Sequence, residues 1–257
     1  MSTASSLPPL PPLKSFSLTH ILYDPSHPPF LSLPLTLLSL SPIFLFVSYF
    51  TLLVFDRRLT VLNLALGSIV NEVLSWTLKR IWKGDRPYVG MGEVGQGYGM
   101  PSSHSQAAGF LVSWGIGYAL TRRKRNVESG DTARSESAQR VRSIRDGVYL
   151  FGLILWSILT AYSRYYLLYH SPKQIYAGYA VGLVFGAFEF VMTEYIPLYY
   201  PSSLIGRLRQ WEEWVWTGIG GVGGWSLGGS RGGWGEGPFV VKQETFASSP
   251  RGKKKRA

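Results

Sequence analysis

The sequence predicts an all-α membrane protein, a polytopic bundle of about five transmembrane helices. Of its 257 residues, 46% are hydrophobic and only 16% are charged, and the apolar residues gather in runs of near-spanning length. Basic residues gather between and after those runs, as is typical of multi-spanning membrane proteins. Cysteine is absent, which excludes disulfides, thiolate catalysis and a cysteine-based metal site.

A proline-rich segment, residues 1–30, precedes the first apolar run. Its prolines favour extended or irregular backbone. It lacks a basic patch followed by a short apolar stretch and a small-residue cleavage site, so no cleaved signal peptide is expected. We then expect a transmembrane domain over residues 31–196. Residues 197–257 are expected to form a cytoplasmic tail with an interfacial helix and a glycine-rich, basic end.

Five apolar runs account for the membrane domain. A hydrocarbon core about 30 Å thick needs roughly 20 helical residues, and the first run satisfies this despite containing Pro34 and Pro42. The later runs are shorter or less purely apolar. The predicted spans are Leu31 to Phe55, Leu59 to about Trp82, about His104 to Leu120, Val148 to Tyr162, and Gln174 to Ile196.

The basic loops predict how the spans are oriented. The arginine-rich segment Thr121 to Asp146 and the turn at Arg57-Arg58 are cytoplasmic by the positive-inside rule. Counting spans from them places three polar stretches together on the opposite face. These stretches are Lys79 to Met100, Pro101 to His104, and Arg164 to Pro172.

Three of the cations in these stretches, Lys79, Arg86 and Arg164, together with the two histidines, suit phosphoryl transfer. Taken singly, a cation at a helix end usually snorkels to headgroups, and Pro101-Ser102-Ser103 is a typical turn and helix cap. Together, fixed Lys and Arg donors can hold the negative charge of a phosphoryl transition state. One histidine can attack phosphorus while the other protonates the departing oxygen. A helix beginning at Ser102 to His104 would also favour an anion.

The net charge of +11 fits membrane topology plus a phosphate site better than nucleic-acid binding. We therefore expect the lipid bilayer and a phosphorylated lipid as partners, and no nucleic acid. Protein partners stay open. Neither a histidine pair at helical spacing nor an Asp-rich cluster is present, so no metal and no cofactor are expected.

The three stretches resemble a known family. Lys79 with Arg86-Pro87, Pro101 to His104, and Ser163-Arg164 with His170 resemble the three signature motifs of the type 2 phosphatidic acid phosphatase superfamily. The resemblance covers about Leu59 to Ile196. Residues around the second and third motifs are most similar to the branch of that superfamily that hydrolyses dolichyl diphosphate.

The resemblance implies a role for each motif residue. His170 would be the nucleophile that becomes phosphohistidine, and His104 the general acid. The residues implied to bind the phosphate are Lys79, Arg86, Ser102, Ser103 and Arg164.

Three further residues are expected to support the site. Gln174 stands where the wider superfamily usually has Asp; its carbonyl can fix the tautomer of His170 but adds no negative charge. Asp85 lies inside the first motif. Glu72 lies seven residues before Lys79, on roughly the same helix face and about 10 Å deeper. The alternative for Glu72 is that it and its neighbour Asn71 bond to adjacent helices.

The resemblance implies hydrolysis of dolichyl diphosphate to dolichyl phosphate and inorganic phosphate at the lumenal face of the endoplasmic reticulum. This reaction recycles the lipid carrier of protein N-glycosylation. Two alternatives stay open: a phosphatidate or sphingoid phosphate phosphatase of the same superfamily, and a non-catalytic lipid binder or scramblase. Lys254 and Lys255 near the C-terminus look like a dilysine retrieval signal, although a basic tail can also contact anionic lipid.

Overall fold

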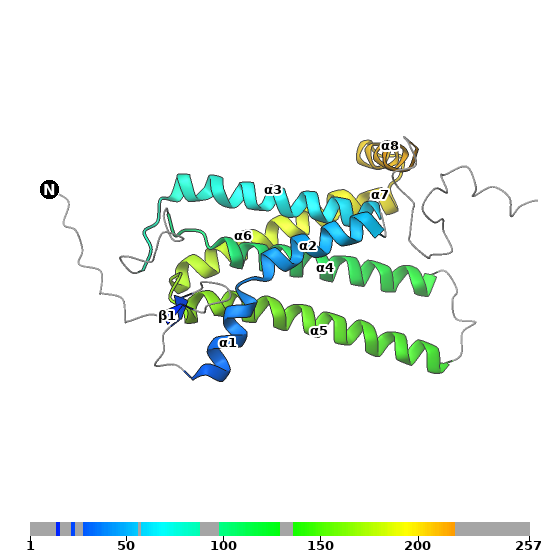
Figure 1. Ribbon diagram of the computed structural model, residues 1–257. Coiled ribbons are helices and arrows are strands. Elements are labelled where there is room, and N and C mark those ends of the chain that lie inside the picture. Colours follow the sequence, from blue (N-terminus) through cyan, green and yellow to red (C-terminus); the bar gives the residue numbers. More distant parts are fainter. Residues whose placement is uncertain are drawn as a thin grey trace, which may run out of the picture.

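The computed structural model describes residues 14–15, 22–23, 28–55, 58–87, 98–128 and 136–218. The predicted all-α bundle is confirmed; within this part of the chain the only strands are one antiparallel pair of two residues each (Figure 1). The elements are β1 (Lys14–Ser15), β2 (Leu22–Tyr23), α1 (Pro29–Leu38), α2 (Ser41–Phe55), α3 (Leu59–Trp82), α4 (Ser103–Glu128), α5 (Glu136–Tyr166), α6 (Pro172–Phe190), the π-helix η3 (Val191–Tyr195), α7 (Ile196–Tyr199) and α8 (Leu204–Gly218).

The long helices α3, α4, α5 and α6 run alongside one another (Figure 1). Among the described residues, three helical stretches are each long and apolar enough to cross a membrane: Leu59–Trp82, Ser143–Tyr166 and Pro172–Tyr199. The predicted second span has these bounds, whereas the fourth and fifth extend several residues beyond their predicted ends. Helix α4 is less apolar because its neighbours cover it, and its buried face includes Gln106 as well as Phe110 and Trp114. It runs beside the three candidate spans, and the third predicted span, about His104 to Leu120, stays a prediction.

The first predicted span, Leu31 to Phe55, is apolar enough to cross a membrane only as a bent pair of helices, and its crossing stays a prediction. It consists of two helices, α1 and α2, that meet at an angle of 46°. Pro42 explains the break, because a proline has no backbone N–H to continue a helix but is well suited to a first helical turn. The chain therefore ends α1 near Ser39 and restarts at Ser41.

Helices α4 and α6 pack through a row of glycines. Gly178, Gly182 and Gly186 recur every four residues on α6, and a Cβ atom at Gly182 would lie 2.0 Å from the carbonyl oxygen of Gln106. Only glycine allows the two backbones to approach so closely, in the small-residue packing typical of membrane helices. Gln174 lies one further step along this row, and its carbonyl oxygen accepts a hydrogen bond from Ser102 N at 3.1 Å. The glycine row therefore fixes the position of α6 against the start of α4.

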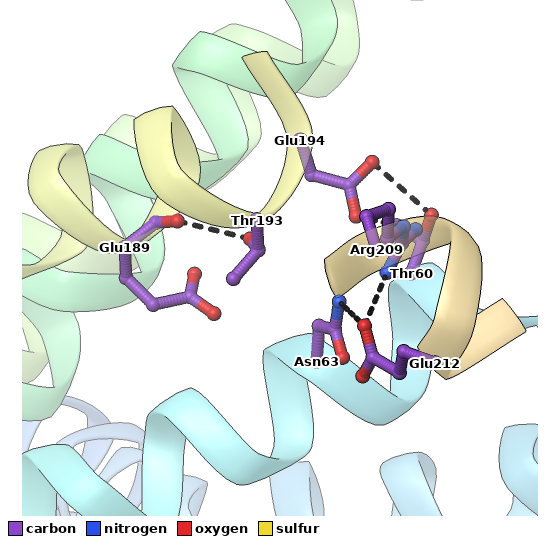
Figure 2. A network of polar contacts seen from close by, with 7 residues as sticks. All are labelled: Thr60, Asn63, Glu189, Thr193, Glu194, Arg209 and Glu212. Carbon is purple, nitrogen blue, oxygen red and sulfur yellow. Dashed lines mark hydrogen bonds and ion pairs between the residues drawn. The ribbon is translucent and has the colours of Figure 1, made fainter. Parts of the chain in front are cut away.

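We call the end of the bundle where α3 and α5 finish and α4 and α6 begin the site end, and the opposite end the tail end. At the tail end, α8 occupies the segment predicted as an interfacial helix, and its location at a membrane interface stays a prediction. Figure 2 shows the polar contacts that join it to α3 and η3. Arg209 pairs with Glu194 at 3.2 Å and with Glu212 at 3.5 Å, while Thr60 and Asn63 donate to Glu194 and Glu212, respectively, each at 3.3 Å.

Candidate active site

The three polar stretches meet at the site end. Lys79, in the last turn of α3, donates from Nζ to the Oγ of Ser103, the first residue of α4, at 2.7 Å. Arg86 donates from Nη1 to the carbonyl oxygen of Tyr169 at 3.4 Å. These contacts bring together residues far apart in sequence, in the arrangement that the span count predicts.

Arg164 lies at the centre of the cluster and is 5% exposed. It occupies the last turn of α5, its guanidinium carbon lies 4.1 Å from the centre of the Tyr169 ring, and its Nη1 donates to the Oγ of Ser39. The Nε atoms of Arg164 and Arg86 are buried, and neither has a hydrogen-bond acceptor within the described residues.

The cations of the cluster lack acidic partners. In the part of the chain that the structure describes, no carboxylate forms an ion pair with Lys79, Arg86 or Arg164. Buried charges are normally paired, because an unpaired one is costly to remove from water. Two guanidinium groups and an ammonium group without counter-ions are suited to holding an anion with several oxygens, such as a phosphoryl group.

His170 follows α5 in a tight turn. Leu168 has a φ of 64°, and the amide N–H of His170 donates back to the carbonyl oxygen of Arg164 at 3.2 Å, which holds the imidazole inside the cluster. Its Nδ1 lies 2.9 Å from the carbonyl oxygen of Gly99 and 3.3 Å from the Oε1 of Gln174. Both oxygens can only accept, so Nδ1 carries the hydrogen and the lone pair of the neutral ring is on Nε2.

The surroundings of His170 keep its ring neutral. The side chain is 5% exposed. Burial, followed by the positive charges of Arg164 and Arg86, lowers the pKa of His170 from 6.5 to about 3. A neutral imidazole with a free Nε2 has the form that nucleophilic attack requires.

Gln174 is bonded through both ends of its amide. Besides His170, its Oε1 accepts from the backbone N–H of Ser171 at 3.1 Å, and its Nε2 donates to the carbonyl oxygen of Asp85 at 2.6 Å. Aspartate could not make the second contact, because a carboxylate has no N–H to donate. Gln174 thus joins the third motif to the first. Asp85 contributes its backbone, since its side chain is exposed.

His104 contacts a residue that the sequence analysis missed. Its Nε2 lies 3.1 Å from the carbonyl oxygen of Ser39, at the break between α1 and α2. Ser39 therefore contacts both His104 and Arg164. The available signal was Pro42, which marks a helix break and hence freed backbone groups close by.

Two expected site residues are placed differently from their predicted roles. Ser102 is fully buried, and its amide, expected to face the phosphate, donates to the carbonyl oxygen of Gln174 instead. Glu72 is exposed on α3, and no hydrogen bond or ion pair joins it to the cluster among the described residues. Its neighbour Asn71 is buried, and its side-chain Oδ1 accepts a hydrogen bond from Nε2 of Gln106 on α4 at 3.0 Å, as the alternative interpretation predicted for Asn71.

Comparison with known proteins identifies the family. The model of the PAP2 superfamily, the type 2 phosphatidic acid phosphatases, matches residues 58–197. The chain belongs to the PAP2 superfamily. Dolichyldiphosphatase 1 of Mus musculus is 32% identical over 178 residues, 69% of each chain, and that of Homo sapiens is 33% identical over 179 residues, again 69% of each. Dolichyldiphosphatase of Saccharomyces cerevisiae is 32% identical over 195 residues, 74% of each chain. No solved structure matches at a significant level.

These comparisons confirm the resemblance predicted from the motifs, at the level of both the superfamily and its branch. As a PAP2 protein with these relatives, the chain is a phosphatase. The three motifs that meet at the site end all lie within the matched residues. The PAP2 match ends in α7 and leaves α8 outside it.

Proposed function

We propose that this PAP2 protein hydrolyses dolichyl diphosphate to dolichyl phosphate and inorganic phosphate through a phosphohistidine at His170. The observation that carries the proposal is the combination of a neutral, oriented imidazole with three cations that form no ion pair with a carboxylate of the described residues. The names of the relatives support the choice of a lipid diphosphate as substrate.

The reaction proceeds in two displacements. In the first, the lone pair on Nε2 of His170 attacks the terminal phosphorus, and the bond from that phosphorus to the bridging oxygen breaks. The electron pair of that bond leaves with dolichyl phosphate, and His104 protonates the departing oxygen. In the second, water attacks the phosphohistidine, its proton passes to His104, and the phosphorus–nitrogen bond breaks to release inorganic phosphate.

The cations stabilise both displacements. Lys79, Arg86 and Arg164 hold the oxygens of the terminal phosphate, and their fixed positions require little reorganisation as negative charge develops. Ser103, bonded to Lys79, and the first amides of α4 line the same pocket. Gly99 and Gln174 keep the hydrogen of His170 on Nδ1, so that Nε2 faces the phosphate throughout.

The test is to trap the intermediate. Dolichyl diphosphate labelled in its terminal phosphate is mixed with purified full-length enzyme and quenched within one turnover. The expected result is a label on His170 that acid removes and base does not, absent from His170→Ala, which should not turn over. A His170→Ala variant with near-normal activity, or a labelled residue other than His170, would overturn the mechanism.

We further propose that the site end faces the lumen of the endoplasmic reticulum and that the tail end is cytoplasmic. The basic segment Thr121 to Asp146 joins α4 to α5 at the tail end, which supports this orientation by the positive-inside rule. Lys254 and Lys255, which lie outside the described residues, would then be available as a cytosolic retrieval signal. Dolichyl phosphate released in the lumen would return to N-glycosylation.

Sealed microsomes test this orientation. Added protease should remove a C-terminal tag from the protein. In a second version, tagged at its N-terminus so that the signal stays at the end of the chain, replacing Lys254 and Lys255 with serine should let the protein leave the endoplasmic reticulum. A protected tag would contradict both the cytoplasmic tail and the lumenal site.

A further inference from the structure

The break between α1 and α2 forms one wall of an apolar groove. The groove measures about 470 Å³, within the range of about 300–1,000 Å³ typical of ligand sites. One side is formed by α1 and α2, and the other by Trp156 of α5. The lining residues are Pro34, Leu37, Leu38, Ser41, Phe44, Leu45, Ser48 and Trp156.

The lining residues of α2 lie on one helix face. Ser41, Phe44, Leu45 and Ser48 are spaced by three or four residues, so they form a continuous strip about 10 Å long. Trp156 holds the far wall in place by donating from Nε1 to the Oγ of Ser41 at 3.2 Å. The strip thus leads from the break between the helices towards the interior of the predicted membrane layer.

The groove begins next to the catalytic cluster. Leu38 and Ser41 line it, and Ser39 between them contacts His104 at 3.1 Å through its carbonyl oxygen and Arg164 through its hydroxyl group. A diphosphate held by Arg164 would therefore lie beside Ser39, next to the residues that line the near end of the groove.

We infer that this groove binds the isoprenoid chain of the substrate, beginning at the break and running along α2. The inference rests on the proposed function and deepens it, because it assigns a site to the part of the substrate that does not react. The lining is almost wholly apolar, with two aromatic side chains and two serines, which suits a branched hydrocarbon chain.

A pair of tryptophan substitutions on α2 tests the inference. Ser48→Trp fills the end of the groove that lies farthest along α2 from the break. The matched control Val47→Trp adds the same side chain at an exposed position of α2 that does not line the groove. Phosphate release is measured with purified full-length enzyme on two substrates: a long-chain polyprenyl diphosphate, and dimethylallyl diphosphate, whose single isoprene unit is too short to reach Ser48.

The expected result is a loss that depends on chain length. Ser48→Trp should lower kcat/KM for the long chain by about tenfold, comparable to losing two buried methylene groups, and leave dimethylallyl diphosphate unchanged. Val47→Trp should change neither value. Equal values for the two variants on the long-chain substrate would overturn the inference, and bulk bilayer lipid would then be the occupant.

A second variant covers the case in which Ser48→Trp damages the fold and slows both substrates. Phe44→Ala removes part of the groove wall without filling it, and it should lower kcat/KM for the long chain alone; an unchanged preference for chain length would reject the groove. Failure of the proposed function would look different from failure of the groove: the unaltered enzyme would release phosphate from neither diphosphate, and the assigned reaction would then be wrong.

Discussion

The two ends of the bundle bury arginines in opposite surroundings. At the tail end, Arg209 has a side chain 16% exposed and pairs with Glu194 and Glu212 (Figure 2). At the site end, Arg164 is 5% exposed, and within the described residues it pairs with no carboxylate. Its contacts are the hydroxyl group of Ser39 and the ring of Tyr169.

This difference distinguishes an arginine that stabilises the fold from an arginine that binds a ligand. A buried arginine that exists to stabilise a protein needs its carboxylate partners, because desolvation otherwise outweighs what the charge contributes. Arg209 has them and joins α8 to η3. Arg164 lacks them, so its counter-ion must come from outside the described chain, and we interpret that counter-ion as the phosphate of the substrate.

Replacing each arginine with alanine should have opposite effects. Arg164→Ala should lower kcat about 10³-fold, which is the effect of removing an arginine that stabilises a phosphoryl transition state. It should not lower the thermal stability of the protein. Arg209→Ala should keep the activity of each folded molecule but lower the free energy of unfolding by about 3 kcal/mol, since the ion pairs with Glu194 and Glu212 are both lost.

Both variants are measured in the same detergent, for phosphate release and for thermal unfolding. An Arg164→Ala protein that unfolds easily, or an Arg209→Ala protein that is stable but inactive, would contradict the comparison. Arg164→Lys is a useful third variant, because it retains the charge but not the bidentate geometry. It should recover only part of the lost rate.

His104→Ala should cause a smaller loss that depends on the leaving group. General acid catalysis typically contributes about 10²–10⁴ in rate, and a phosphate leaving group needs less protonation than an alcohol. The loss should therefore be smaller on dolichyl diphosphate than on any phosphate monoester the enzyme accepts. Equal losses on both would mean that His104 acts mainly by positioning or charge.

The site end was more predictable from sequence than the path of the chain around it. Lys79, Arg86, His104, Arg164 and His170 could be selected because ionisable side chains stand out against apolar spans. Their convergence followed from counting spans. The function of Ser102 in joining α4 to α6 could not be read in this way, because its amide partner is a backbone carbonyl distant in sequence.

The contribution of Ser39 was hidden for a related reason. Its carbonyl oxygen carries no side-chain signal, and it reaches His104 only because α1 and α2 are separate helices. Length and hydropathy alone merged these helices into one span. The glycine row on α6, in contrast, was visible in the sequence as Gly178, Gly182 and Gly186, and its four-residue spacing would have predicted the close packing of α6 against another helix.

Gln174 offers a more subtle test of the site end. The low pKa of His170, about 3, means that acidification from pH 7 to pH 5 should not protonate it, so kcat/KM should not fall over that range through the nucleophile. Gln174→Glu would place a negative charge beside Nδ1, which favours the imidazolium form and raises the pKa of His170. The acid limb of kcat/KM should then move to higher pH.

The pH dependence of kcat/KM is compared between variants on the same substrate. Protonation of the diphosphate then affects all of them equally. Gln174→Ala should lower the rate, since it removes the contacts to His170 and Asp85. The hydrogen bond to Gln174 raises the pKa of His170, so its loss should move the acid limb to lower pH, opposite to the effect of Gln174→Glu. If both variants moved the limb in the same direction, the effect would come from lost structure rather than from electrostatics.

The smallest expected effect is that of a chelator, which should leave kcat unchanged. Phosphoryl transfer commonly relies on metal ions to bridge phosphate oxygens and neutralise developing charge. Here Lys79, Arg86 and Arg164 already supply three fixed positive charges at the site end, whereas the positive charge of Arg209 at the tail end is already paired with Glu194 and Glu212 and is not available to a phosphate. Phosphate release from dolichyl diphosphate is measured in excess EDTA and again after adding Mg²⁺ in excess over the chelator. Activity lost in EDTA and restored by Mg²⁺ would mean that a metal ion, rather than the unpaired cations, carries the charge of the transition state, and the contrast between Arg164 and Arg209 would lose its catalytic meaning.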